Sequence, residues 1–505
     1  MSTRWLKWTL GCAAAVLLGL VATFVWLARP SHITALVQSG LAEHLQLDAT
    51  LDRIEVSWLP RPSIHAQGFA LRMPNQPDLP PLIAIDEFSV DIGPLSLIRK
   101  RVDTVYARGL HITVPPGDVR DDLPGRDGQT GRTDIIISHF ITEDASLQFL
   151  RNNGRKPLTF AIHDLRAHEI GFGLAMPFDA TITNPVPTGL VTTTGTFGPW
   201  VPGEIFASPL EGDYTFEHAD LSTINGIGGT LESTGHYSGT IQRIVAQGQA
   251  QVPDFSLDLG GRPQALTADF DAVVTGTNGT TVLERVDATL VHTRMAVEGA
   301  VINLDGPGNH ALEFAVKIED GRIEDILALI IDSPQPVMTG DVVVDARMAL
   351  PPGPAPVSRR LSVDGRFGLA ETTFTDKEVQ SKMESLSRRS QGKDEEDPIG
   401  KVLTNLRGQV RLANGTARLS RLTFQVPGAR VALDGTYGLA TGALDFRGTL
   451  RMQATVSQAV GGFKSIFLKP FNPLFRKDGA GAVIPIKIEG TREAPKFGVE
   501  FGKIF

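Results

Sequence analysis

The feature that most constrains this chain is the alternation of apolar and polar residues, which recurs along most of its length. In LDFRGTLRMQ, the apolar Leu444, Phe446, Leu450 and Met452 share one phase. Successive side chains of a strand point to opposite faces, so this pattern predicts a strand with one apolar face. The same pattern occurs in IEVSW, FSVDI, LHITV, FSLDL, LTADFDAVV and LEFAVKI. Such runs predict roughly 25 strands.

An apolar face of this extent has to be covered by something. In LTADFDAVV, the apolar phase holds Leu266, Phe270 and Val274. A sheet buries such a face against helices, a second sheet or a ligand that is not protein. Few helical stretches are present, so the strands either form stacked sandwiches or one sheet that curls into a gutter. An unfilled gutter would expose a large apolar patch, so lipid acyl chains would fill it. Periodicity leaves both alternatives open.

Short connections favour antiparallel pairing. Asn278-Gly279 and Asn414-Gly415 lie between alternating runs, and Asn-Gly is the preferred two-residue hairpin turn. Both also match the glycosylation sequon, but the hairpin explains both residues of each pair. Helical spacing of apolar residues predicts short helices over 321–332 and 376–390.

The N-terminus predicts a membrane anchor. Residues 8–28 carry no charge, and a helix of that length crosses the hydrocarbon core. Arg4 and Lys7 precede this stretch, so residues 1–7 are expected in the cytoplasm, as a short tip. A cleaved signal peptide is the alternative, although its apolar region is usually shorter. Cys12 is the single cysteine, so the chain forms no intramolecular disulfide.

Composition and motifs argue against several functions. The net charge of −8 excludes nucleic acid as the expected partner, because such binding relies on Lys and Arg. Nucleophile-elbow, phosphate-loop and zinc-protease motifs are missing from the sequence. His163 and His168 have a spacing that places them on opposite faces of a strand, and Asp341 and Asp345 fit a solvated strand face. We therefore predict neither an enzyme nor a cofactor, and no metal site.

One segment combines aromatic and basic residues without any acid. Within 459–477, we predict that seven side chains contact either a membrane surface or a partner protein. They are Phe463, Lys464, Phe467, Lys469, Phe471, Arg476 and Lys477. The alternative is an end cap that covers the apolar edge of the sheet.

Several stretches resemble the AsmA family of Gram-negative bacteria. The similarity is greatest in 441–501, which ends in VIPIKIEGT and PKFGVEF, and it extends to 235–301. The layout of a short tip, one membrane helix and the strand LDRIEVSW is also similar. The resemblance implies a single-pass inner-membrane protein whose bulk is periplasmic. It divides the chain into a tip (1–7), a transmembrane helix (8–28), a β-groove region (29–320) and an AsmA-like C-terminal region (321–505).

The expected fold is therefore mainly β. A transmembrane helix precedes an elongated, curled antiparallel sheet that forms a hydrophobic groove, with a few short helices. By resemblance, the function is to hold or conduct phospholipids and so support outer-membrane biogenesis. The residues proposed to line the groove are Leu266, Phe270, Val274, Leu444, Phe446, Leu450 and Met452. The partners are phospholipids, the inner membrane and the outer membrane or its assembly proteins. The alternative function is a periplasmic scaffold that assists assembly of outer-membrane protein or lipopolysaccharide without lipid transport.

Overall fold

The structure is a computed structural model. It describes residues 48–57, 63–73, 76, 79–91, 100–115, 136–150, 157–171, 173–201, 204–224, 226–276, 279–303, 310–375, 377–391, 404–453, 483–491 and 494–499. The predicted membrane helix over 8–28 and the aromatic and basic segment over 459–477 lie outside these residues. Among the residues described, no helix combines the length and the apolar character needed to cross a membrane.

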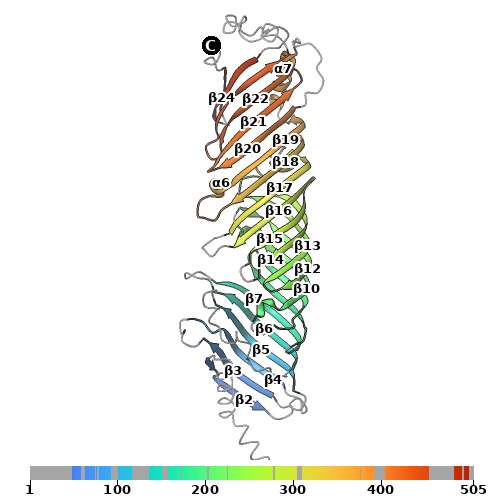
Figure 1. The fold of residues 1–505 in the computed structure, drawn as a ribbon, viewed down its shortest axis with the longest axis vertical. Coiled ribbons are helices and arrows are strands. Elements are labelled where there is room, and N and C mark those ends of the chain that lie inside the picture. The colour runs from blue at the N-terminus through green and yellow to red at the C-terminus, as the bar shows by residue number, and fades with distance from the viewer. Residues whose placement is uncertain are drawn as a thin grey trace, which may run out of the picture. The chain divides into compact units, whose positions relative to one another are not determined.

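The described residues form a mainly β structure, as predicted, with 25 strands in one mixed sheet and few short helices (Figure 1). The strands are β1 (Asp48–Thr50), β2 (Arg53–Ser57), β3 (Ser63–Arg72), β4 (Ile83–Asp91), β5 (Arg101–Val114), β6 (Ile136–Phe149), β7 (Leu158–Ile170), β8 (Met176–Pro185), β9 (Thr188–Phe197), β10 (Pro209–Asp220), β11 (Ile227–Gly228), β12 (Thr230–Thr240), β13 (Arg243–Leu257), β14 (Gln264–Val274), β15 (Thr281–Leu290), β16 (Thr293–Asn303), β17 (His310–Arg322), β18 (Met338–Leu350), β19 (Ser362–Phe374), β20 (Thr404–Ala413), β21 (Thr416–Val426), β22 (Ala429–Gly438), β23 (Ala443–Met452), β24 (Val483–Thr491) and β25 (Pro495–Val499). The helices are α5 (Ile323–Ala328), α6 (Val357–Arg360) and α7 (Lys377–Ser390), with 3-10 turns at Ile205–Ala207 and Leu221–Thr223.

The chain divides into two compact units. Unit 1 comprises Met1–Glu217 and His236–Ile244, and unit 2 comprises His218–Gly235 and Val245–Phe505. Each is described separately below. The boundary that the family resemblance implies at residue 320 stays a prediction.

The sheet of unit 1 departs from the predicted all-antiparallel arrangement. β5 and β6 pair in parallel, with Ala107 opposite Thr142. A parallel pair cannot be joined by a tight hairpin and needs a crossover of a dozen or more residues. The connection from Val114 to Ile136 is long enough for such a return. Alternation predicts which residues form a strand, but it does not predict the direction of the neighbouring strand. The prediction of an all-antiparallel sheet was therefore wrong here.

Direct pairing in unit 1 aligns one row of small and apolar residues across β2 to β9. Ile54 lies opposite Ala66, which lies opposite Phe88, and the row continues through Ala107, Thr142, Leu165, Ala180 and Thr193. Every member of the row is buried or half-buried. We call this side the apolar face of unit 1. Because most of these side chains are small, they fill only a thin layer above the sheet.

In unit 2, the strands from β14 to β25 pair antiparallel with their sequence neighbours. Asn414 and Gly415 have φ of 52° and 72° and join β20 to β21, as the Asn-Gly hairpin prediction required. Gly279, with φ of 75°, lies between β14 and β15, whereas Asn278 is outside the described residues.

The helices confirm one expectation and narrow another. α7 covers the segment predicted over 376–390, whereas α5 is shorter than the helix predicted over 321–332. The reason is that Gly321 and Arg322 still pair with β18, so the helix begins only at Ile323.

The polar face of the strands carries cross-strand ion pairs, such as Arg366 with Asp345 at 2.5 Å.

Candidate functional site

The candidate site is one face of the sheet in unit 2. Pairing aligns Phe270 with Val286, and the row then continues through Val297, Val316, Ala346, Gly365, Val410, Leu419, Gly435, Phe446 and Ile488. Two residues proposed from the sequence, Phe270 and Phe446, therefore share one row from β14 to β24. We call the side that carries this row the apolar face of unit 2.

Two further rows flank the first on the same face. One joins Leu444 to Ala272 through Tyr437, Ala417, Leu412, Val363, Met348, Phe314, Gly299 and Leu283. The other joins Leu450 to Gly321 through Val431, Phe424, Leu406, Leu369 and Val342. None of the residues in the three rows is charged. The seven predicted lining residues all lie on this face, since Leu266, Val274 and Met452 keep the phase of their strands.

Bulges preserve this face where the simple alternation fails. In β15, Glu284 and Arg285 are both exposed, and the register shifts between Leu283 and Val286. In β17, Glu319 and Asp320 are likewise both exposed. Each bulge adds one residue to the polar side, so that the apolar residues before and after it stay on the same face.

Burial on this face is incomplete. Among the described residues, Leu290 is the largest side chain that is almost completely buried, and the next largest in that class are threonines and serines. Phe270, Leu444 and Leu450 are only half-buried, although they lie inside strands. A dry core of a domain buries many large apolar side chains completely. Protein therefore does not fully cover this face.

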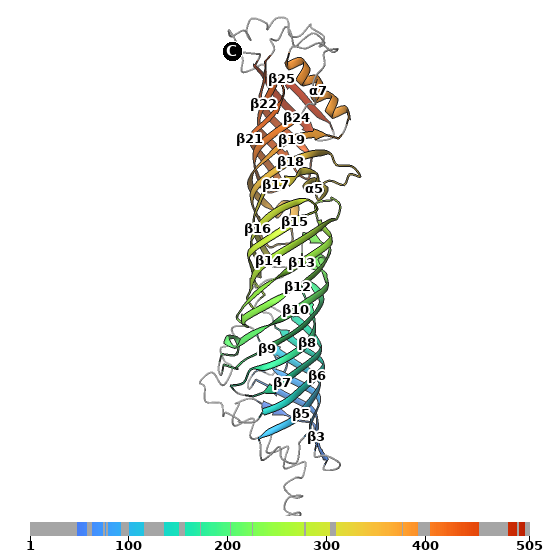
Figure 2. The same ribbon diagram turned by 90° about the vertical axis from the view of Figure 1, so that its right-hand side faces the viewer.

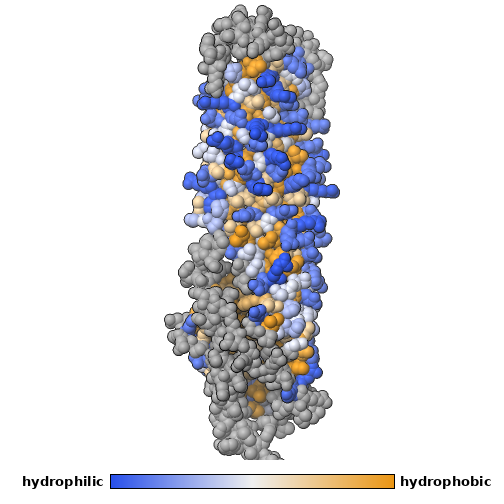
Figure 3. Space-filling model, viewed as in Figure 1, coloured by the Kyte–Doolittle hydropathy of each residue, from blue (hydrophilic) through white to orange (hydrophobic). Residues whose placement is uncertain are grey.

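One buried cluster of this face lies on β22 and β23. Phe446 is 8% exposed and forms a cluster with Val431 and Leu433. A Cβ added to Gly435 would lie 2.5 Å from the ring of Phe446, so a glycine is needed beneath this ring. Met452 is also buried. In Figure 3, apolar and charged residues lie side by side over this unit, on the surface in view.

Helix α7 covers one end of the face. Its Met383 and Leu386 pack against Val426 and Ala429, and the predicted lining residue Leu450 packs against the same two residues. The C-terminal end of the helix is fixed to the turn between β21 and β22, because the Ser387 hydroxyl donates to the carbonyl oxygen of Pro427 at 2.8 Å.

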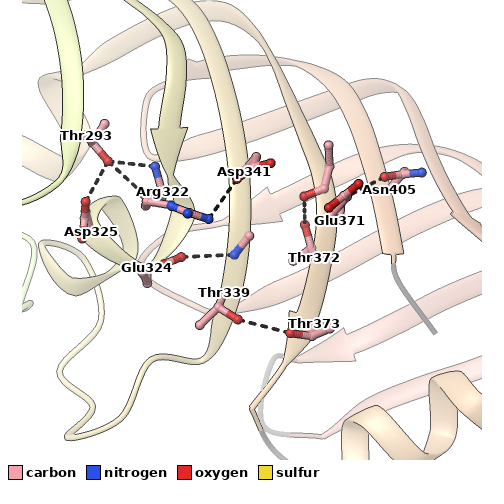
Figure 4. A network of polar contacts seen from close by, with 12 residues as sticks. Thr293, Arg322, Glu324, Asp325, Thr339, Asp341, Glu371, Thr372, Thr373 and Asn405 are labelled. Atoms are coloured by element: carbon pink, nitrogen blue, oxygen red, sulfur yellow. Dashed lines mark hydrogen bonds and ion pairs between the residues drawn. The ribbon is translucent and has the colours of Figure 1, made fainter. Parts of the chain in front are cut away.

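Helix α5 covers the face between β18 and β19. Ile323 packs with Val342 and Leu369. A polar network holds the helix in place (Figure 4). The carboxylate of Asp325, which is 6% exposed, accepts from the Thr293 hydroxyl at 2.9 Å and from the backbone N–H of His292 at 3.0 Å.

The same network ties α5 to two neighbouring strands. The Thr293 hydroxyl accepts from the backbone N–H of Arg322 at 2.9 Å, and the Glu324 carboxylate accepts from the N–H of Gly340 at 3.1 Å. The guanidinium of Arg322 reaches Asp341 at 3.0 Å. Asp341 is thus a partner of Arg322, on the polar side that the sequence predicted.

Unit 1 holds a polar site that the sequence analysis missed. The Tyr237 hydroxyl lies 2.7 Å from the Thr193 hydroxyl, which donates to the carbonyl oxygen of Asp213 at 2.8 Å. A Cβ on Gly195 or Gly212 would lie 2.9 or 2.6 Å from that tyrosine oxygen, so both glycines make room for it. Burial raises the pKa of Tyr237 above its usual value.

Tyr237 therefore places a hydroxyl among half-buried residues of unit 1. The signal in the sequence was the pair of strand-interior glycines, because Gly inside a strand often marks a close approach of another group. The approach itself depends on a residue from β12 that meets β9 and β10, and no local pattern predicts that.

The two histidines that are close in sequence, His163 and His168, contact different residues in the structure. His163 contacts the Thr183 hydroxyl at 2.7 Å, whereas His168 contacts His139 at 3.0 Å. His163 and His168 therefore have different partners. Residues Phe463 to Lys477 of the predicted contact segment are outside the described residues, so that prediction stays open.

No protein-family model matches the chain, and no curated protein sequence matches it. The resemblance to the AsmA family therefore stays a prediction from the residues.

Proposed function

We propose that this protein holds or conducts phospholipids, whose acyl chains lie on the apolar face and whose headgroups stay in water. We further propose that residues 8–28 anchor it in the inner membrane of a Gram-negative cell and that the described residues are periplasmic. Outer-membrane lipid homeostasis is the process that such a protein would serve.

The observation that carries the proposal is the incomplete burial of an uncharged face. Three rows of apolar residues cross this face, one of them from β14 to β24, yet large side chains such as Phe270 and Phe314 stay partly exposed. A solvent-facing surface of this extent is unfavourable in water. Acyl chains would remove it from water without any further protein layer.

The curvature of unit 2 supports this reading. Figure 2 shows the strands of this unit crossing one another in projection, as expected for a strongly twisted sheet that curls. A curled sheet turns one face towards its own interior, where an acyl chain touches several strands at once. This interior is the groove that we propose for the acyl chains.

The mechanism is passive. Each buried methylene contributes about 0.8 kcal/mol, which offsets removal of the lipid from the bilayer. Because none of the residues in the rows is charged, neighbouring positions differ little in energy for an acyl chain. A lipid could therefore slide between them without a deep trap. Direction and driving force would have to come from elsewhere.

The second candidate is a scaffold for assembly of outer-membrane protein or lipopolysaccharide. The covering of the face by α5 and α7 favours it locally, since protein packs on Val342, Leu369 and Leu450 there. Under this alternative, a partner protein would cover the half-exposed side chains.

Site-specific photocrosslinking of the full chain in the cell envelope tests the proposal. A photoreactive phenylalanine analogue replaces Phe270 on the apolar face, and Thr267, exposed on the polar face of the same strand, provides the matched control. We expect phospholipid adducts at position 270 and none at position 267. Protein adducts at 270 in place of lipid would favour the scaffold.

A further inference from the structure

The structure brings together two histidines that the proposed function does not use. His139 on β6 lies directly opposite His168 on β7, in unit 1. Their Nδ1 atoms are 3.0 Å apart, and the ring planes are nearly perpendicular at 89°, with centroids 5.2 Å apart. His139 is three residues from Thr142, so the pair lies on the side opposite the apolar face.

We propose that His139 and His168 bind a divalent ion of a late first-row transition metal, such as Zn²⁺. Imidazole nitrogen is a preferred ligand of these ions. Two nitrogens at about 2.0–2.1 Å from a tetrahedral ion are about 3.3–3.4 Å apart. The observed 3.0 Å therefore needs only a small ring adjustment. Adjacent strands supply both ligands, so little backbone movement is required.

Metal binding replaces a proton at this pair. With the rings as placed, one Nδ1 carries a hydrogen and the other accepts it, because two bare nitrogens at this distance repel one another. A bound ion takes the lone pairs of both Nδ1 atoms, so the hydrogen of the donor ring moves, by exchange with water, from Nδ1 to the outer Nε2 of that ring. Both ligands are then neutral imidazoles, as this type of coordination requires.

The surroundings leave the remaining coordination positions open. The carboxylate of Glu169, next to His168, is ion-paired with Arg101. Arg166 lies 3.3 Å from Asp164. Within the part of the chain that the structure describes, no third histidine, cysteine, aspartate or glutamate is grouped with the pair for metal binding. Water or an external ligand would complete the shell, which is typical of an exchangeable site rather than a closed structural one.

This inference is independent of the proposed lipid function. The two residues are 29 positions apart, and the strand register alone places them together. His163 is near His168 in sequence, whereas the neighbour of His168 in space is His139.

Calorimetric titration of the purified, tag-free full chain with ZnCl₂ at neutral pH, after chelator treatment, tests the site. The variants are H139Q and H168Q, and the matched control is H163Q, which removes a histidine of the same strand as His168 whose ring contacts the Thr183 hydroxyl. We expect about one ion per chain in the wild type and in H163Q, and binding weakened about tenfold or more in H139Q and H168Q.

Absence of Zn²⁺ binding to the wild type would overturn the proposal. Equal weakening in H163Q, or unchanged binding in H139Q and H168Q, would overturn it as well. If circular dichroism shows that a variant does not fold, chemical protection of the histidines in the wild type tests the site instead. Zn²⁺ should shield His139 and His168 from diethyl pyrocarbonate, as read by mass spectrometry, and leave His163 reactive. Equal reactivity of all three with and without Zn²⁺ would refute the site.

Discussion

The substitution Phe314→Glu distinguishes an open, lipid-covered face from a dry protein core. Phe314 lies on β17 in the row between Leu444 and Ala272, and it is half-buried. Its ring covers Gly299 on β16, because a Cβ on that glycine would lie 2.6 Å from the ring. The next residue, Ala315, is exposed on the polar face and provides the matched control Ala315→Glu.

The expected cost follows from the burial. Complete burial of a phenylalanine side chain contributes about 1.5–3 kcal/mol, so the partly exposed ring of Phe314 contributes about 1–2 kcal/mol. The glutamate can reach water from an open face, so it adds little further penalty. In a dry core, loss of the ring alone costs about 3–5 kcal/mol, and an unpaired buried charge adds to this. The two cases therefore differ by several kcal/mol.

Two measurements on the same preparations give the answer. Urea unfolding reports the free energy of unfolding, and lipid extraction with mass spectrometry reports bound phospholipid. We expect Phe314→Glu to lose about 1–2 kcal/mol and to retain less lipid, and Ala315→Glu to change stability by less than about 0.5 kcal/mol with lipid unchanged. A loss above about 3 kcal/mol, or lipid content equal to the wild type, would refute the reasoning.

Three further predictions concern stability and ionisation. Phe446→Ala should lower the free energy of unfolding by about 3–5 kcal/mol, whereas Leu444→Ala should lower it by about 1 kcal/mol, because Phe446 is buried and Leu444 is partly exposed. Equal urea midpoints for the two variants would contradict this difference in burial. Asp325→Ala should cost about 1–3 kcal/mol, and a double-mutant cycle with Thr293→Val should be non-additive; strict additivity would show that the two side chains do not interact. Because burial raises the pKa of Tyr237 above 10.0, its stabilising contribution is present below pH 10 and is lost as pH rises through the folded pKa. Tyr237→Phe should remove a phenol that ionises above the usual pH range of tyrosine in an ultraviolet titration, and loss of a transition within that usual range would contradict this.

Much of the fold follows from local patterns. Alternation over 444–453 and 266–274 correctly predicted strands and the residues that share a face, since the strand period is fixed at two residues. The Asn414-Gly415 turn was predictable because few residues adopt positive φ. Helix α7 was predictable from apolar residues at helical spacing.

The parallel pairing of β5 and β6 was not predictable, because a strand's own residues do not specify the direction of its neighbour. The bulge at Glu284 and Arg285 was also hidden, since it breaks the alternation that the prediction relied on.

The sequence by itself determined that this chain forms strands with one apolar face, because each residue's phase depends only on its near neighbours. Only the tertiary structure decided how far that face is covered. It showed Phe446 buried over Gly435, while Phe270 in the same row stays half-exposed. It also placed His139 opposite His168. Such contacts depend on register between distant segments, and register is set by the pairing of whole strands rather than by any short stretch of sequence.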